Sequence, residues 1–61
     1  MMTLKDARRA AAQLAEAQAM KQLIVEAAAS PSDYFVWPGR VALDARRWRI
    51  VEVIRPEEAK R

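Results

Sequence analysis

The apolar positions in the first half of the chain follow the spacing of a helix, but the apolar stripe changes side near its middle. When successive residues are placed about 100° apart, two clusters separate. One face carries Leu4, Ala7, Ala11 and Leu14, and the nearly opposite face carries Met20, Leu23, Ile24 and Ala27. A heptad repeat that begins at Leu4 is broken at Gln18 and Lys21, so the segment does not predict a regular coiled coil.

Composition strengthens the prediction of a helix in this half. Residues 3–29 contain ten alanines and neither glycine nor proline, and most of the other positions hold residues that favour helices. Thr3 can cap the amino end, and Asp6 suits both the cap and the helix dipole. Pro31 pushes the residue before it out of the helical region. We therefore expect a helix over residues 4–29.

The length of this predicted helix is itself informative. Its 26 residues would extend about 39 Å, whereas a compact chain of 61 residues has a diameter of roughly 27 Å. Either the helix breaks into two near Ala15–Ala19, or one end projects and meets another chain. The second alternative predicts a homo-oligomer, because small side chains let helices approach closely. Its self-association face would consist of Leu4, Ala7, Ala11 and Leu14.

Residues 30–39 predict a connector between two different kinds of structure. Within it, Tyr34–Trp37 has the composition of a strand. Pro38-Gly39 is typical of a turn. At the other end of the chain, Pro56 ends the last predicted strand, and residues 56–61 are expected to form a frayed tail.

Residues 40–55 predict a β-hairpin. Its first strand would be Arg40–Leu43, its turn Asp44–Arg47, and its second strand Trp48–Arg55. Residues 41–47 would also fit a helix, so the first strand has an alternative. The second strand is the safer prediction because it is rich in isoleucine and valine.

The second predicted strand carries apolar residues on both faces. Strict alternation places Trp48, Ile50 and Ile54 on one face and Val51 and Val53 on the other. A hairpin with one face in water would alternate more cleanly. We therefore expect the helix to cover one face, and a partner or the segment Tyr34–Trp37 to cover the other. The fold class predicted is α+β, a long and kinked or continuous N-terminal helix followed by a short antiparallel hairpin or small sheet, in one domain over residues 1–61.

The residue types that are missing exclude most catalytic chemistry. The chain has no cysteine and no histidine, which excludes disulfides, zinc sites built on those ligands, and histidine acid–base catalysis. Its single glycine excludes a glycine-rich phosphate loop. The eight carboxylates are scattered without the spacing of a calcium loop. We expect no enzyme activity, no cofactor and no bound metal.

Charge and targeting signals are weak. Eleven basic residues against eight acidic ones give a net charge of +3, a slight argument for a polyanionic partner. The first residues lack the apolar run of a signal peptide, and no stretch approaches the roughly 18 apolar residues of a membrane span. We therefore expect a soluble, cytoplasmic protein of bacterial or phage origin with no membrane partner.

The most concentrated chemistry lies in Arg46-Arg47-Trp48-Arg49. Tryptophan and arginine dominate the energetics of protein interfaces. The predicted partner-binding residues are therefore Trp37, Arg46, Arg47, Trp48 and Arg49. The leading hypothesis is a small, non-catalytic protein–protein interaction module that self-associates, such as a phage accessory, virion or host-complex-inhibiting protein. The alternatives are a nucleic-acid-binding module that uses the same residues and a structural subunit of a larger viral assembly.

Residues 38–57 resemble the hairpin near the end of tailed-phage head–tail joining proteins. Those proteins often show a turn, an alternating strand, a second turn, an aromatic residue and an Ile/Val-rich strand that ends in Pro-Asp or Pro-Glu. In this chain the corresponding features are Pro38-Gly39, Val41–Leu43, Asp44–Arg47, Trp48 and the strand that ends at Pro56-Glu57. Ala45 stands where such turns usually have glycine. The resemblance covers about a third of the chain; it implies a phage or prophage setting and assigns no residue a role.

Overall fold

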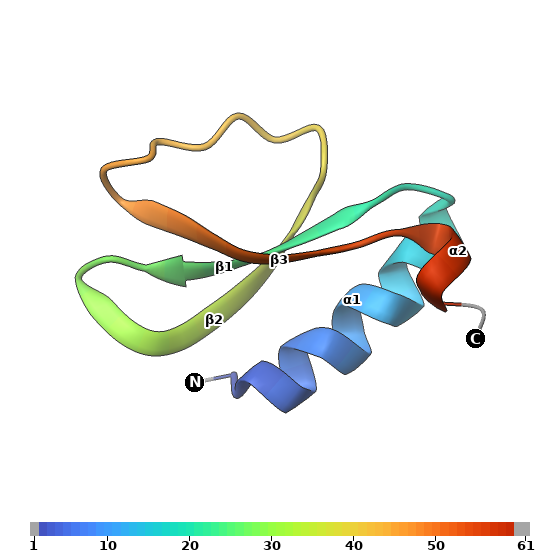
Figure 1. Ribbon diagram of the computed structural model, residues 1–61, viewed down its shortest axis with the longest axis horizontal. Coiled ribbons are helices and arrows are strands. Elements are labelled where there is room, and N and C mark those ends of the chain that lie inside the picture. The colour runs from blue at the N-terminus through green and yellow to red at the C-terminus, as the bar shows by residue number, and fades with distance from the viewer. Residues whose placement is uncertain (1, 60–61) are drawn as a thin grey trace.

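A helix followed by a three-stranded antiparallel sheet makes up most of the molecule (Figure 1). The computed structural model describes residues 2–59. Its elements are α1 (Leu4–Gln18), β1 (Gln22–Ala27), β2 (Ser30–Pro38), β3 (Trp48–Ile54) and a short helix, α2 (Pro56–Ala59). The predicted α+β class, with an N-terminal helix before a small antiparallel sheet, is confirmed. No helix within residues 2–59 is long and apolar enough to cross a membrane.

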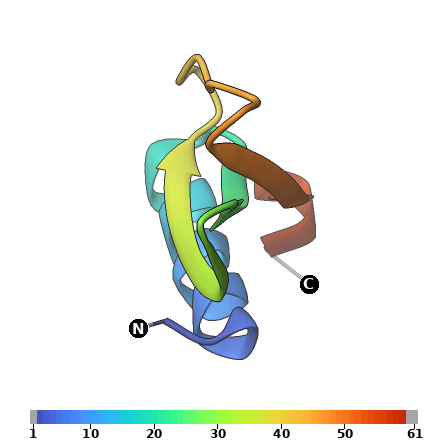
Figure 2. The same ribbon diagram turned by 90° about the vertical axis from the view of Figure 1, so that its left-hand side faces the viewer.

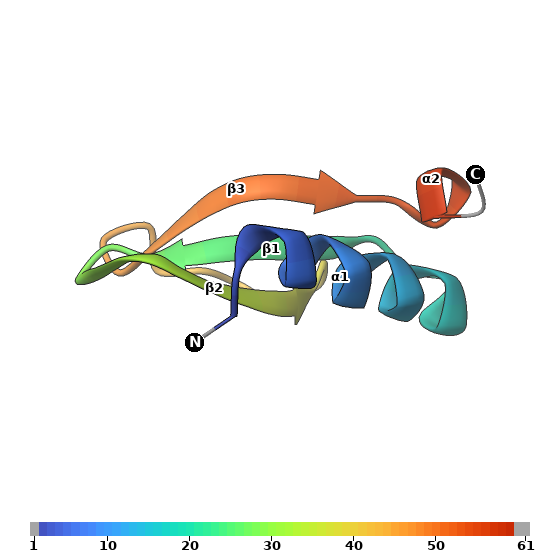
Figure 3. The ribbon, with the colours of Figure 1, turned by 90° about the horizontal axis from the view of Figure 1, so that it is seen from below.

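The first strand lies at the centre of the sheet. The strand order is β2-β1-β3, and both outer strands run antiparallel to β1. Figure 3 shows the three strands side by side with α1 in front of one face. Because β2 and β3 run in the same direction, residues 39–47 must carry the chain back along the sheet. Figures 1 and 2 show this connection on the side of the sheet away from α1.

Helix α1 begins as predicted but ends eleven residues earlier than predicted, at Gln18 instead of residue 29. The Thr3 hydroxyl accepts a hydrogen bond of 3.1 Å from the backbone N–H of Asp6, which confirms the predicted cap. Ala19 then adopts a left-handed conformation with a φ of 50°, so the chain does break inside the predicted segment Ala15–Ala19.

Beyond this break the chain forms a strand and not a second helix, so the prediction of helix through residues 22–27 was wrong. Leu23, Ile24 and Val25 are all buried, on both faces of the central strand. A helix of the same residues could not bury three consecutive large side chains against so few remaining residues. Burial therefore outweighs the helix preference of the alanines that come after them.

The predicted hairpin over residues 40–55 does not form. Its second strand is present as β3, but residues Arg40–Leu43 are not a strand, and β3 pairs with β1 instead. The predicted turn does form, since the carbonyl of Asp44 accepts from the backbone N–H groups of Arg47 and Trp48, both at 3.0 Å. The central strand offers β3 a full-length partner, which the short segment before the turn could not match. The hairpin that carried the phage resemblance is therefore absent.

The turn predicted at Pro38-Gly39 is present, whereas the frayed tail predicted after residue 55 is not. The backbone N–H of Val41 donates to the Pro38 carbonyl at 3.1 Å, which confirms the turn predicted after residue 37. Gly39 passes so close to Lys21 that a Cβ there would lie 2.9 Å from the Lys21 carbonyl oxygen, so this approach requires glycine. Residues 56–59 form a helical turn against α1 where a frayed tail was predicted. The end of that predicted tail, residues 60–61, lies outside the described residues.

The core lies between α1 and the sheet, and its helix side is built from alanine. Ala7, Ala11 and Ala15 are fully buried and pack with Ile24 and Ile54. Their small side chains let the helix lie close to the sheet. With 15 residues, α1 is about 22 Å long and fits within the molecule's longest dimension of 33 Å. The length argument for a projecting helix therefore no longer applies.

The proposed self-association face is accordingly split. Ala7 and Ala11 lie in the core of the single chain, so they are not on a free surface. Leu4 is partly buried against the same core. Leu14 alone among the four is exposed, at 37%. Self-association stays a prediction, but this helix face does not supply it.

Candidate functional site

Two turns meet at one end of the sheet and position the predicted arginines. The backbone N–H of Ala28, in the β1–β2 turn, donates to the carbonyl of Arg47 at 2.8 Å. The side chain of Asp44 accepts from the backbone N–H of Arg46 at 2.9 Å. Asp44 therefore organises its turn through both its carbonyl and its carboxylate, as aspartate commonly does in turns. As a result Arg46 and Arg47 are held beside Trp48 with both side chains exposed.

Trp48 is the central ring of a cluster of three aromatic side chains. Its ring centroid lies 4.5 Å from that of Trp37, with the planes at 63°. It lies 5.3 Å from that of Phe35, with the planes at 87°. Register explains the arrangement, because Trp48 lies opposite Ala27, whose methyl group leaves room for the indole ring. The cluster lies on the face of the sheet away from α1, where Phe35 and Trp37 of β2 meet Trp48 of β3. The segment Tyr34–Trp37 is a strand of the same sheet, so a partner that covers this face stays a prediction.

An irregularity in β3 changes which residues share that face. Val25 lies opposite Ile50, whereas Ile24 lies opposite Glu52, so Val51 is an extra residue in a β-bulge. Beyond the bulge the side-chain alternation is shifted. Ile54 therefore packs in the α1 core, and the predicted grouping of Trp48, Ile50 and Ile54 on one face was wrong for its last member.

Arg49 is separated from the other predicted partner-binding residues. Its guanidinium forms an ion pair with Glu26, the residue opposite it in β1. Alternation along the strand directs this side chain away from the face that carries Trp48. Glu26 also accepts from the backbone N–H of Ser32 at 2.9 Å. The structure therefore brings together Trp37, Trp48, Arg46 and Arg47, and gives Arg49 a structural partner.

An apolar groove runs beside Trp48, between the loop of residues 39–47 and β3. Its volume is about 570 Å³. We call it the Trp48 groove, and it is lined by Ala28, Leu43, Ala45, Trp48, Arg49 and Ile50. A second depression, of about 540 Å³, shares Ala28 and Trp48 with it and is also lined by Ala27, Ala29, Arg46 and Arg47. Apolar lining and two guanidinium groups thus meet at one end of the sheet.

Ile50 is an exposed apolar residue of this groove that the sequence analysis did not name as a binding residue. Half of its surface is exposed, which makes it the most exposed of the large hydrophobic residues in this part of the molecule. Val41, in the loop of residues 39–47, and Val51, in β3, are also exposed, each at 37%. Alternation already placed Ile50 beside Trp48, but only the fold shows that the loop leaves it uncovered.

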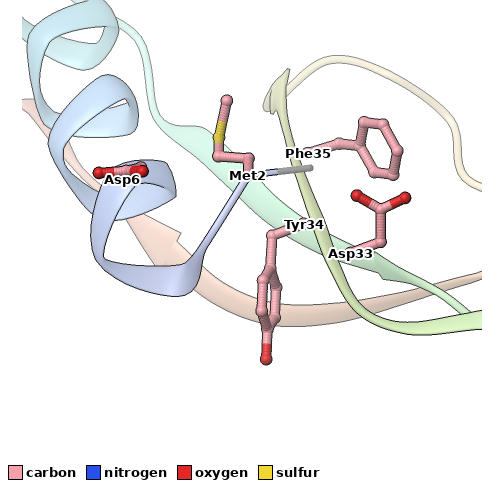
Figure 4. Close-up of a pocket in the computed structure, with 5 residues that line it drawn as sticks. All are labelled: Met2, Asp6, Asp33, Tyr34 and Phe35. Carbon is pink, nitrogen blue, oxygen red and sulfur yellow. The ribbon is translucent and has the colours of Figure 1, made fainter.

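A separate hollow lies where the start of α1 approaches β2. It is lined by Met2, Asp6, Asp33, Tyr34 and Phe35. Figure 4 shows Asp33 and Phe35 on one side of β2, Tyr34 on the other, and Asp6 apart from them on α1. The two carboxylates do not converge on one point. Among the side chains of residues 2–57, no group of three or more acidic residues is placed to hold a metal ion.

The comparison with known proteins adds no assignment. No protein family, no curated protein and no solved structure matches this chain.

Proposed function

We propose that this chain is a small, non-catalytic protein-interaction module that binds another protein through the Trp48 groove. The observation that carries the proposal is the exposure of Ile50 in an apolar groove whose wall is Trp48. Contiguous exposed apolar surface on a small domain commonly marks an interaction site. A cytoplasmic location, as the sequence suggests, belongs to the same proposal.

The composition of this surface is that of an interface centre with a polar rim. Tryptophan and arginine are the residues that most often contribute strongly to binding between proteins. Here Trp48 is fixed by two aromatic neighbours, so little side-chain freedom remains to be lost on binding. Arg46 and Arg47 stand at its edge, where they can pair with a partner's carboxylates.

Site-specific photo-cross-linking tests the proposal. A photo-reactive amino acid is introduced at Ile50 in one variant and at Leu14 in another, both in cells that encode the protein. Leu14 is an exposed apolar residue on α1, which makes it the matched control. We expect a discrete protein adduct from position 50 and none from position 14. Absence of adducts at both positions, or the same adducts at both, would contradict the proposal.

Nucleic-acid binding is the second candidate, because Arg46 and Arg47 are exposed beside an aromatic ring. It predicts an affinity for single strands that falls steeply with salt concentration. In the cross-linking experiment it predicts an adduct at position 50 that is removed by nuclease. A nuclease-resistant protein adduct favours the first candidate.

A further inference from the structure

We propose, on the basis of the proposed function, that the Trp48 groove binds a peptide segment in which a large apolar side chain lies next to aspartate or glutamate. The apolar side chain would occupy the groove between Leu43, Trp48 and Ile50. The adjacent carboxylate would pair with Arg46 or Arg47. Two observations carry the proposal. The groove is apolar, and two exposed arginines line the depression that adjoins it.

The groove suits an apolar side chain. Its volume of about 570 Å³ lies within the range of roughly 300–1,000 Å³ that is common for ligand sites. Leu43, Ala45 and Ile50 bring no polar side-chain atoms into it. Ile50 is half exposed, so a partner side chain placed against it would remove apolar surface from water on both molecules.

The arginines differ in how fully they are already paired. Arg8 is held by Glu52 at 2.9 Å, and Arg49 is held closely by Glu26. Arg47, in contrast, lies 3.8 Å from Asp44, and both side chains are largely exposed, so this pair contributes little. In the part of the chain that the structure describes, no ion pair involves the guanidinium of Arg46. Arg46 and Arg47, which line the depression next to the Trp48 groove, are therefore able to accept a new carboxylate, whereas Arg49, which lines the groove itself, is already paired.

The aromatic cluster fixes the wall of the groove. Trp48 makes edge contacts with both Trp37 and Phe35. The ring therefore acts as a fixed wall of the groove. A fixed wall suits the insertion of a side chain, and two neighbouring guanidinium groups suit bidentate pairing with carboxylates.

Selection from a displayed library of random peptides tests the chemistry. Peptides of about eight residues are used, which span roughly 26 Å when extended. They are selected on the full chain, and the recovered pool is sequenced. We expect enrichment of aspartate or glutamate next to leucine, isoleucine, phenylalanine or tryptophan. A selected peptide should bind at least about tenfold more weakly to Ile50→Lys and to the double variant Arg46→Ala/Arg47→Ala.

Leu14→Lys, which removes an exposed apolar residue elsewhere, is the matched control and should leave peptide binding unchanged. Thermal unfolding of each variant shows that it is folded. No enrichment, enrichment of basic or wholly polar peptides, or equal binding to all variants would overturn the inference. If cross-linking at Ile50 yields a protein adduct but the library enriches peptides without acidic residues, the inference fails while the proposed function stands. If a single-stranded oligonucleotide displaces the selected peptides, the same groove binds nucleic acid and the inference is overturned.

Discussion

Glu26 and Ser32 are joined across the β1–β2 turn by a hydrogen bond of 2.9 Å from the Ser32 backbone N–H to the Glu26 carboxylate. Ser32 has a φ of 71°, in the left-handed region that is unfavourable for residues other than glycine. The same carboxylate pairs with Arg49 of β3. One side chain of β1 therefore links the start of β2 to β3 and helps to hold Ser32 in its unfavourable conformation.

These contacts predict a pH-dependent stability. The Ser32 N–H is the main cause that lowers the pKa of Glu26, with Arg49 acting in the same direction and partial burial against it. This pKa is lower in the folded chain than in the unfolded chain. The ionised carboxylate therefore stabilises the fold fully at pH values above its ordinary pKa of 4.5. That contribution is lost as the pH falls through the folded-state pKa.

Glu26→Gln should therefore be less stable than the wild type near neutral pH, and the difference should shrink as the pH falls below 4.5. Denaturant unfolding at a series of pH values measures this difference. Glu16→Gln, an exposed change on α1, controls for the loss of one negative charge. A difference between Glu26→Gln and wild type that stays constant with pH would show that the carboxylate is not ionised differently in the two states.

The end of α1 gives a second prediction. Ala19 ends the helix with a φ of 50°, a conformation in which glycine is favoured over alanine by about 1 kcal/mol. Ala19→Gly should therefore raise the unfolding temperature. Ala17→Gly, two residues earlier inside the helix, should lower stability by about 1 kcal/mol. Opposite signs in thermal unfolding are expected, and a loss of stability in both variants would place residue 19 within the helix.

Local caps and turns were easier to predict from the sequence than the type of the elements between them. Thr3 and Asp6 marked the beginning of α1 because a cap is a local interaction between neighbouring residues. Asp44 marked its turn for the same reason. The identity of residues 22–27 depended instead on what else was available to bury Ile24 and Val25. That is a property of the whole chain, and helix propensity does not report it.

The candidate site was predicted in part. Trp37, Trp48, Arg46 and Arg47 do come together. The sequence could single them out because tryptophan and arginine are the residue types that contribute most often to protein interfaces. The role of Ile50 and the pairing of Arg49 with Glu26 were not predicted. Both depend on the pairing of β3 with β1 in place of the predicted hairpin. The bulge at Val51 moved Ile54 to the α1 side of the sheet, and because a bulge has no distinctive residue type, the sequence pattern alone does not reveal it.

The alanine face of α1 supplies a third prediction. Ala11 is fully buried between α1 and the sheet, so a larger side chain there must displace its neighbours. Ala11→Leu should destabilise the fold by about 1–3 kcal/mol, whereas Ala17→Leu, on the exposed side of the same helix, should have little effect. Denaturant unfolding gives both values. If Ala11→Leu instead leaves stability unchanged and alters the mass measured by light scattering, this face lies between chains.

The aromatic cluster supplies a fourth prediction, because its rings contact one another edge to face. Trp37 and Trp48 lie 4.5 Å apart between ring centroids, and such pairs are typically coupled by about 0.5–1.5 kcal/mol beyond the area they bury. A double-mutant cycle with Trp37→Leu and Trp48→Leu should recover a coupling of this size in the free energy of unfolding.

The matched control cycle combines Trp48→Leu with Tyr34→Leu. Tyr34 packs on the α1 side of the sheet, whereas Trp48 belongs to the cluster on the other side, so the two changes should be additive within about 0.5 kcal/mol. Near-ultraviolet circular dichroism should lose its tryptophan signal in either tryptophan variant, because the signal requires both rings to be held in a fixed arrangement. Equal coupling in both cycles would mean that the substitutions act through a general loosening of the sheet. In that case Trp48 would not be the fixed wall that the proposed binding of a partner requires.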